Sequence, residues 1–269
     1  MYLSIDIGGT KTLLALFNRR GKMLRKYKFP TPKDPEQFIY YLQEHLSPLL
    51  PARKKLHAVT VAFPGVIKNG HPTTADNLPR WNNFPVGARI EALFSQSTPV
   101  YFANDASLAS VFEAYRLRGK TIFLTFSTGI GGGIVQNNKL TKASNTFEPG
   151  HTKYTYDGQT LEWEDIASAR SIGEHFGMVA TNVKGAKNNR EIAARIALGL
   201  PDIIKKYHPD TIVIGGPMGR TFNKFKKYLI KELKEQLGGP LPRLKKPKKP
   251  LESVVYGCYL YAKRQAKKS

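Results

Sequence analysis

The sequence predicts an α/β fold made of two copies of one strand–turn–strand unit, and three observations support this prediction. Residues 4–11 (SIDIGGTK) form a glycine-rich segment between two apolar runs of β type. Residues 125–133 (TFSTGIGGG) repeat that arrangement about 120 residues later. Buried strands and amphipathic helices follow both segments in a similar order. This succession is typical of a duplicated, ribonuclease-H-like fold.

The first half is predicted to open with a three-strand meander and to continue with alternating helices and strands. Residues 31–35 (TPKDP) end the meander and open a helix, whose apolar residues recur at helical spacing. We expect strands at residues 2–6, 12–18, 23–29, 56–63 and 99–103, helices at residues 36–50, 86–94 and 105–117, and a loop at residues 67–85.

The second half is predicted to repeat this order. A Gly-Gly-Pro segment at residues 238–240 marks the end of its longest helix. We expect strands at residues 121–125, 132–136, 139–140 and 211–214, and helices at residues 163–176, 191–207, 222–237 and 253–266. One domain is therefore expected at residues 1–118, joined by residues 253–269, and a second at residues 119–252. A cleft between the two would be the natural ligand site.

The two glycine turns are candidate phosphate sites. Glycine lets backbone N–H groups approach a ligand closely, and such turns form nests suited to phosphate oxygens. Neither turn is a Walker loop or a Rossmann fingerprint, because strand-like sequence rather than a helix follows each. Either turn alone is most simply an ordinary hairpin. The pair together, with Asp6 leading the first, favours two domains that grip one phosphate chain.

Composition excludes several classes of protein. The chain has 269 residues, 41% of them apolar, and no apolar run long enough to cross a membrane. Its one cysteine, Cys258, excludes an intramolecular disulfide and a cysteine-based zinc cage. No signal peptide is visible at the N-terminus, so we expect a cytoplasmic protein.

The net charge of +22 raises the possibility of a polyanionic partner. Residues 220–269 hold 15 Lys and Arg against 3 Glu, and residues 245–250 (KKPKKP) are the densest cluster. No RNA-binding or helix-turn-helix signature accompanies the charge. A solvated basic surface is therefore favoured over a nucleic-acid partner, while inorganic polyphosphate remains a possible one.

Seven motifs, in order, resemble those of the ROK sugar kinases, which belong to the actin-like ATPase superfamily. The resemblance covers nearly the whole chain. It comprises DIGGTK at residues 6–11, PGVI at 64–67, NL with Trp at 77–78 and 81, ANDA at 103–106, STGIGGG at 127–133, EPGH at 148–151 and IGGP at 214–217. Val66 stands where the family has a second proline. Each motif alone is weak, but seven in the family's order are specific.

One segment departs from the family. Most members carry a Cys-x-Cys-x-x-x-x-Cys zinc loop between the motif that resembles EPGH and a sugar-binding glutamate. Residues 155–164 (TYDGQTLEWE) contain no cysteine, so we expect no zinc, and His151 would lack a metal. Alignment on residues 167–170 (ASAR) places the family's sugar-binding glutamate at Glu164, with Glu162 as a neighbour that could be confused with it. Zinc-free members exist, including glucokinases that use polyphosphate.

The resemblance also implies an enzyme rather than a regulator. The family's transcription repressors carry a winged helix before the first phosphate motif. Here that motif begins at residue 4, which leaves no room for a winged helix, so we expect a kinase.

Asp105 is the expected general base, since it begins a helix whose positive end keeps a carboxylate ionised. From the residues alone, a helix N-cap is the favoured role of Asp105. Asp6 is placed to hold Mg²⁺ through water, although it could simply open the hairpin. The resemblance implies sugar contacts from Gly65, Asn77, Asn104, Asp105, Glu148, His151 and Glu164. It implies phosphate or nucleotide contacts from Asp6, Gly8, Gly9, Thr10, Lys11, Thr128, Gly129, Gly131, Gly132, Gly215 and Gly216.

The expected function is that of a cytosolic glucokinase of glycolysis, which uses ATP and Mg²⁺ to phosphorylate the 6-hydroxyl of glucose. An N-acylhexosamine kinase, acting on N-acetylglucosamine or N-acetylmannosamine, is the nearest alternative, and polyphosphate is an alternative donor. A more remote possibility is a non-catalytic sugar sensor or nucleic-acid-binding protein. The resemblance also implies a homodimer.

Overall fold

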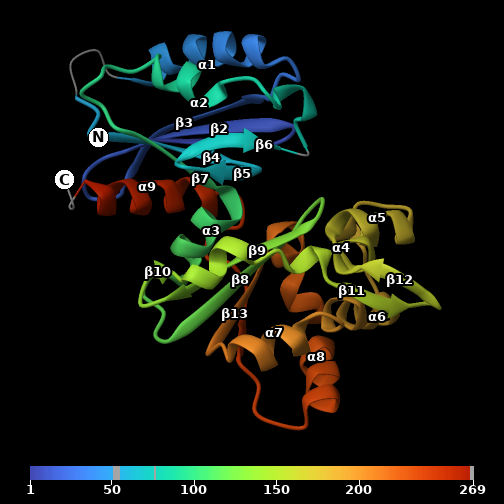
Figure 1. Cartoon of the computed structure of the whole chain (residues 1–269). Helices are drawn as coiled ribbons and strands as arrows, with labels where there is room; N and C mark the ends of the chain where they lie inside the picture. The colour runs from blue at the N-terminus through green and yellow to red at the C-terminus, as the bar shows by residue number, and fades with distance from the viewer. Residues whose placement is uncertain (51–54, 76, 267–269) are drawn as a thin grey trace. The chain divides into compact units, whose positions relative to one another are not determined.

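The computed structural model describes residues 1–50, 55–75 and 77–266, and the chain divides into two compact units (Figure 1). Unit 1 comprises Met1–Phe112 and Val254–Ser269, of which the last three residues lie outside the described ranges. Unit 2 comprises Glu113–Ser253. The sequence analysis placed the first boundary at residue 118, whereas the compact units divide within helix α3 (Asp105–Ala114). None of the helices in the described part of the chain has the length and apolar character needed to span a membrane.

Unit 1 is built on a five-stranded mixed sheet in the order β3-β2-β1-β4-β7. Strands β1 and β2 pair antiparallel, as do β2 and β3, whereas β1 pairs parallel to β4 and β4 parallel to β7. The strands are β1 (Tyr2–Ile7), β2 (Lys11–Phe17), β3 (Met23–Pro30), β4 (Ala58–Phe63) and β7 (Val100–Asn104).

Helices cover both faces of this sheet (Figure 1). Helices α1 (Pro35–Leu49) and α2 (Val86–Glu91) bury their apolar side chains on one face, and α9 (Ser253–Gln265) covers the other. Helix α1 begins where expected because the Asp34 carboxylate accepts a hydrogen bond from the Gln37 N–H at 2.8 Å. At Gly257 in α9 a Cβ would collide with the backbone of Leu108 in α3, so glycine lets these two helices pack closely.

Unit 2 repeats the sheet of unit 1 in the order β10-β9-β8-β13-β14. The same succession of two antiparallel pairs and two parallel pairs recurs. Its strands are β8 (Lys120–Phe126), β9 (Ile130–Gln136), β10 (Lys139–Leu140), β13 (Thr211–Gly215) and β14 (Arg243–Lys245). The predicted duplicated α/β fold is therefore confirmed, although the sequence analysis missed β14.

Two helices expected in unit 2 are each interrupted. Residues 163–176 form α4 (Trp163–Ala167) and α5 (Ala169–Phe176), because Ser168 leaves the helical conformation and its hydroxyl caps α5 at Ser171 N–H. Residues 186–207 form α6 (Ala186–Ala197) and α7 (Leu200–Tyr207), separated at Gly199. Helix α8 (Gly216–Leu237) begins at the glycine pair rather than at residue 222. Short 3-10 helices occur at η1 (Pro79–Trp81), η2 (Lys142–Thr146), η3 (Pro149–His151) and η4 (Ala180–Asn182).

Two hairpins were missed although the sequence contains their signals. Strands β5 (Val66–Lys68) and β6 (His71–Thr74) occupy part of the expected loop, and β11 (Lys153–Tyr156) pairs with β12 (Gln159–Glu162). Their turns are Asn69-Gly70, with φ of 49° and 81°, and Asp157-Gly158, with φ of 50° and 73°. Asn-Gly and Asp-Gly are the dipeptides that favour such two-residue turns.

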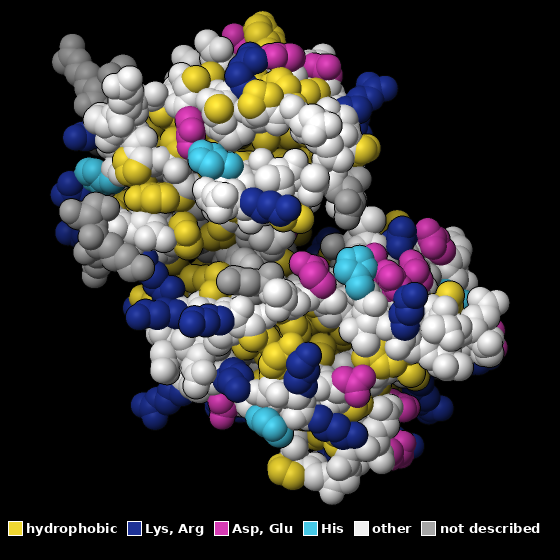
Figure 2. Space-filling view, in the orientation of Figure 1, with side chains coloured by type: hydrophobic (Ala, Val, Ile, Leu, Met, Phe, Trp, Pro, Cys, Tyr) yellow, Lys and Arg dark blue, Asp and Glu magenta, His cyan; other side chains and the backbone are white. Residues whose placement is uncertain are grey.

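The basic segment at residues 245–250 is held in place by a buried carboxylate. Glu113 is 1% exposed, and it accepts hydrogen bonds from the Lys248 N–H at 2.7 Å, the Lys249 N–H at 3.3 Å and the Ser253 hydroxyl at 2.5 Å. The segment is therefore an ordered part of unit 2. On the face drawn in Figure 2, Lys and Arg side chains are scattered rather than gathered in one patch.

Candidate active-site residues in the two units

In unit 1 the first glycine turn lies against Asn77, one of the predicted sugar-binding residues. Residues 8–10 join β1 to β2, and the Gly8 N–H donates to the Lys11 carbonyl at 3.1 Å. A Cβ on Gly9 would lie 2.9 Å from the Cβ of Asn77. The Lys33 ammonium donates to the Gly9 carbonyl at 2.8 Å. Asn77 and the turn are thus brought together, and Lys33 adds a cation that the sequence analysis did not single out, because nothing in the local sequence marks it.

Asp6 and Asp105 interact electrostatically in unit 1. Strands β1, β4 and β7 are parallel, so their carboxyl ends share one edge of the sheet. Asp6 is near the end of β1, and Asp105 directly follows β7. Burial, and after it the negative charge of Asp105, raise the pKa of Asp6 from 3.8 to about 7, and Lys28 partly opposes both effects. Asp6, expected to hold Mg²⁺, and Asp105, expected to act as the base, are therefore close enough for the charge of one to raise the pKa of the other.

The capping role considered for Asp105 is taken by its neighbour. The Asn104 side-chain oxygen accepts a hydrogen bond from the Ser107 N–H at 3.1 Å, and its amide nitrogen donates to the Gly65 carbonyl at 3.4 Å. The Asp105 carboxylate accepts from the next backbone N–H, that of Ala106, at 2.7 Å. Asn104 therefore ties the start of α3 to Gly65, a predicted sugar-binding residue, and Asp105 occupies the first turn of that helix, where the helix dipole favours its charged form.

Gly65 is in a position that no side chain could occupy. A Cβ there would collide with the carbonyl of Thr74 and lie 2.9 Å from the Cα of Ala75. The β5–β6 hairpin thus folds back onto Gly65. Beneath the same sheet edge, burial raises the pKa of the Cys258 thiol, and the nearby charge of Asp6 raises it further, so this cysteine stays protonated and unreactive.

In unit 2 the second glycine turn is in contact with Glu164. Residues 127–129 join β8 to β9, and the Ser127 N–H donates to the Gly129 carbonyl at 2.9 Å. The Glu164 carboxylate accepts from the Ile130 N–H at 3.1 Å. A Cβ on Gly129 or on Gly150 would lie 2.5 or 2.6 Å from that carboxylate. Glycine at both positions therefore makes room for Glu164 beside the turn.

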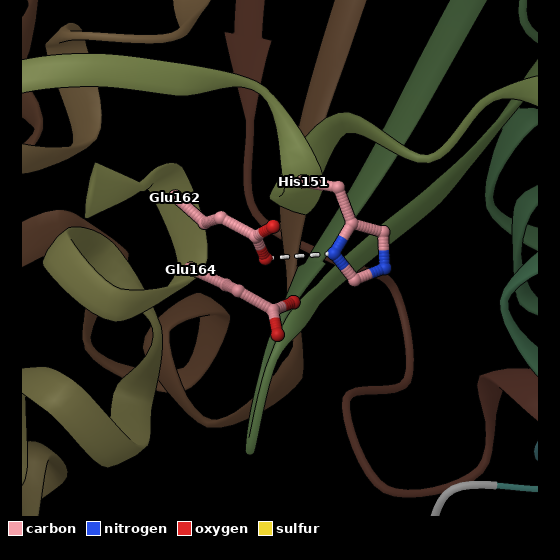
Figure 3. Close-up of side chains that lie close together, drawn as sticks. All are labelled: His151, Glu162 and Glu164. Carbon is pink, nitrogen blue, oxygen red and sulfur yellow. Dashed lines mark hydrogen bonds and ion pairs between the residues drawn. The ribbon is translucent and has the colours of Figure 1, made fainter. Parts of the chain in front are cut away.

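Glu164 also belongs to a cluster with His151 and Glu162 (Figure 3). His151 Nδ1 lies 2.9 Å from Glu162 Oε2, and one possible ligand atom from each of the three residues lies within 4.8 Å of the others, close enough to hold a metal ion. The hydrogen bond to Glu162 raises the pKa of His151 above its usual value, burial partly opposes this, and the charges of Glu164, Glu162 and Glu148 add to it.

The remaining candidate glycines of unit 2 lie in or beside the sheet. Gly131 and Gly132 lie in β9, where a Cβ on Gly132 would come 2.5 Å from the Phe123 carbonyl. Gly215 ends β13, and Gly216 has a φ of 66° and lies against the Phe126 carbonyl. Because β8 and β13 are parallel, the second turn and the Gly215-Gly216 pair share one edge of the sheet. Packing alone accounts for several of these glycines, and contact with a nucleotide stays a prediction.

The structure thus gathers the candidates into one set in each unit. Unit 1 brings together Asp6, Gly9, Gly65, Asn77, Asn104 and Asp105, and unit 2 brings together Gly129, Ile130, His151, Glu162 and Glu164, with Glu148 acting on His151 through its charge. Thr10, Lys11 and Thr128 lie in or next to the turns. Sequence analysis named Glu162 only as a neighbour of Glu164, since a contact across a hairpin has no local signature.

Comparisons with known proteins show the family of the chain. The profile of the ROK family matches residues 2–263. An N-acetylmannosamine kinase of Escherichia coli is 31% identical over 248 residues, which covers 81% of this chain and 83% of that protein. An N-acetylmannosamine kinase of Vibrio cholerae is 33% identical over 251 residues, which covers 81% and 84%.

A solved structure shows the same fold over the full length. The ROK family glucokinase of Streptomyces griseus, in complex with glucose and AMPPNP, superposes with a TM-score of 0.77 at 21% identity, covering 100% of this chain and 99% of that one. The chain therefore belongs to the ROK family, and the named enzymes that it resembles at 31–33% identity are sugar kinases.

Proposed function

We propose that this chain transfers the γ-phosphoryl group of ATP to the 6-hydroxyl of a hexose, with Asp105 as the general base. The position of Asp105 carries the proposal. It lies in the first turn of α3 at the carboxyl edge of the sheet, beside Asp6, while Asn104 caps the helix. The capping bond to the Ser107 N–H is thus made by Asn104, and the Asp105 carboxylate in this place suits proton transfer.

In the proposed reaction the sugar 6-oxygen attacks the γ-phosphorus as the bond to the ADP oxygen breaks. The proton of the hydroxyl passes to Asp105, so that the products are a sugar 6-phosphate, ADP and a protonated carboxyl group. A positioned base contributes roughly 10²–10⁴-fold in rate. Asn104, held by Ser107 and Gly65, would orient a hydroxyl next to the base.

Asp6 fits the role of a residue that holds Mg²⁺. Its pKa of about 7 shows that burial and Asp105 disfavour the charged form. A divalent cation would offset both effects, and a carboxylate that holds it through water suits the strong hydration of Mg²⁺. When bound with ATP, Mg²⁺ neutralises the charge that develops on the phosphate oxygens. Lys11 and Lys33, both at the first turn, would add donors to those oxygens.

Two sugars are candidates for the substrate. The sequence analysis placed glucose first, as expected of a glucokinase in glycolysis. The names of the relatives at 31–33% identity favour N-acetylmannosamine, so we now place that sugar first and glucose second. Polyphosphate stays an alternative donor, because residues 245–250 hold an ordered group of lysines. The homodimer also stays a proposal, which sedimentation of the purified protein would test.

A coupled assay of ADP release tests the proposal. ATP–Mg²⁺ is supplied with N-acetylmannosamine, glucose, N-acetylglucosamine, mannose or fructose, and each turnover is compared with that of Asp105→Asn. Turnover with one of these sugars that is lost in the variant supports the proposal. A parallel assay supplies polyphosphate in place of ATP and measures the sugar phosphate formed, and product with polyphosphate but not with ATP would make polyphosphate the donor. No phosphorylation with either donor would contradict the kinase proposal and leave the sugar-sensor alternative.

A further inference from the structure

Glu164 and His151, the two predicted sugar-binding side chains at the second turn, are held in different ways. Glu164 is fixed by a backbone donor, the Ile130 N–H, and by close packing against two glycines. The His151 ring projects from η3 and is hydrogen-bonded to a side chain, that of Glu162 (Figure 3). The His151 side chain is 57% exposed, so little packing restrains its rotation. Its orientation therefore depends on the carboxylate of Glu162.

The β11–β12 hairpin brings Glu162 to His151. Lys153 pairs with Glu162 across the hairpin, and the Trp163 N–H donates to the Thr152 carbonyl at 2.8 Å just beyond that pair. Trp163 is fully buried, which anchors the end of the hairpin in the core of unit 2. The backbone of Glu162 is thus fixed next to that of His151, and the carboxylate reaches Nδ1 without a mobile segment between them.

We propose that Glu162 is a positioning residue, which holds His151 through Nδ1 so that Nε2 is the ring atom presented to a sugar oxygen. The inference rests on the proposed function, since it assigns the sugar as the partner of Nε2. It also explains how a protein side chain can orient the imidazole. That side chain is Glu162, which the alignment with the family treats only as a neighbour of Glu164.

The charges around His151 influence whether Nε2 is a hydrogen-bond donor or an acceptor. Glu148, Glu162 and Glu164 are the charged groups that act on the ring, and together they raise its pKa. Below that pKa both ring nitrogens carry protons, so Nδ1 donates to Glu162 while Nε2 donates to the sugar. Above it one proton leaves, and because the carboxylate keeps the proton on Nδ1, Nε2 becomes an acceptor. Glu162 thus sets both the direction of the ring and its charge.

The test compares Glu162→Gln with a matched control, Asp165→Asn. Gln keeps an acceptor near Nδ1 but removes the charge. Asp165 lies one residue after Glu164 and is paired with Arg170 at 3.1 Å, so its variant removes a nearby charge without touching His151. Proton NMR follows the titration of the His151 ring, assigned with the variant His151→Gln, and calorimetry measures sugar binding in each protein.

We expect Glu162→Gln to lower the pKa of His151, because the hydrogen bond to the charged carboxylate is lost. We expect the sugar dissociation constant measured above neutral pH to rise about fivefold, as for loss of one exposed charged contact, with kcat changed less than the KM for sugar. Asp165→Asn should leave the pKa of His151, the sugar dissociation constant, kcat and KM close to wild type. Unchanged sugar binding in Glu162→Gln would overturn the proposal, whatever the pKa of His151.

Two further outcomes separate this inference from the proposed function. If the wild-type protein binds a sugar but phosphorylates none, the proposed function fails, and the dissociation constants still judge the role of Glu162. If it binds no sugar from the panel, both fail. Stoichiometric zinc in the purified protein, lost in Glu162→Gln, would overturn positioning by direct contact in favour of a metal ligand.

Discussion

The two glycine turns have the same topology, but charges of opposite sign contact them. Residues 8–10 and residues 127–129 each join the first two strands of a five-stranded sheet with the same strand order. The first turn receives the Lys33 ammonium on the Gly9 carbonyl, whereas the second donates the Ile130 N–H to the Glu164 carboxylate. The strand order and the place of the turn are repeated in the two units, but the charged side chain that contacts the turn differs.

The residues near the strand ends that precede the two turns also differ in charge. Asp6 and Thr125 occupy equivalent places, since each precedes the last residue of its strand and faces the next parallel strand, at Ala62 and Gly215. The first is a carboxylate whose charged form burial disfavours, and the second is a neutral hydroxyl. We infer that unit 1 supplies the charged groups of the reaction, and that unit 2 supplies a neutral strand end with a carboxylate on the turn.

Replacing the proposed base should have the largest effect. Asp105→Asn keeps the shape of the side chain and the acceptor for the Ala106 N–H, but it cannot take up the proton. We expect kcat to fall by about 10³-fold, with sugar binding largely intact. ADP release and calorimetry measure the two quantities. Turnover within about tenfold of wild type would contradict the assignment and the view that unit 1 holds the reacting carboxylates.

The opposite end of helix α3 should matter for stability instead. Glu113→Ala removes the carboxylate that accepts hydrogen bonds from the Lys248 N–H, the Lys249 N–H and the Ser253 hydroxyl. We expect the free energy of unfolding in urea to fall by about 3 kcal/mol, whereas Glu113→Gln, which keeps one acceptor, should cost less. A loss below about 1 kcal/mol for Glu113→Ala would mean that the carboxylate does not anchor the basic segment.

Asp6 should reduce the stability of the ligand-free protein at neutral pH. Its pKa is raised from 3.8 to about 7, so the folded state keeps a proton that the unfolded state loses. Protonated Asp6 costs the folded protein no stability below about pH 4. The free energy of unfolding then falls as the pH rises, because the unfolded state releases the proton first, and the loss is complete above about pH 7. Asp6→Asn should therefore stabilise the protein by about 2 kcal/mol at pH 8, with a smaller gain at pH 5, and abolish turnover.

The neutral strand end of unit 2 provides the control for that experiment. Thr125→Asp places a carboxylate where unit 2 has a hydroxyl, and we expect it to destabilise the protein at pH 8. Urea denaturation at both pH values measures all three proteins. A fall in stability for Asp6→Asn at pH 8 would show that other contacts of the Asp6 carboxylate outweigh its burial.

Alanine substitutions in the two turns should give the smallest effects and distinguish the turns. In Gly129→Ala the new Cβ meets the far end of Glu164, which can move, so we expect sugar binding to weaken about fivefold with little change in stability. In Gly9→Ala it meets the Cβ of Asn77, which cannot rotate away, so we expect a loss of about 1 kcal/mol in stability. Calorimetry and urea denaturation measure the two. Equal effects in both variants would contradict the difference between the turns.

Local sequence predicted the repeated elements well where a single pattern decided them. The glycine turns, the buried strands at β1, β8 and β13, and the start of α1 follow from apolar runs, turn residues and an N-cap. The β11–β12 hairpin was missed although Asp157-Gly158 marks its turn, because its strands are polar and partly exposed. The expected helix of residues 163–176 was wrong at Ser168, where the hydroxyl caps a new helix.

By itself, the sequence determined the duplicated fold, the family and the candidate residues of the two turns, because each depends on local spacing and motif order. Only the tertiary structure decided that Asn104 rather than Asp105 caps α3, that Glu113 holds the basic segment, and that Glu162 holds His151. Each of these three side chains lies at or near the end of a helix or strand. The carboxylates of Glu113 and Glu162 find their partners on other elements, which depends on packing in three dimensions. The cap of α3 is local, but Asn and Asp are both good caps, so the sequence could not choose between Asn104 and Asp105.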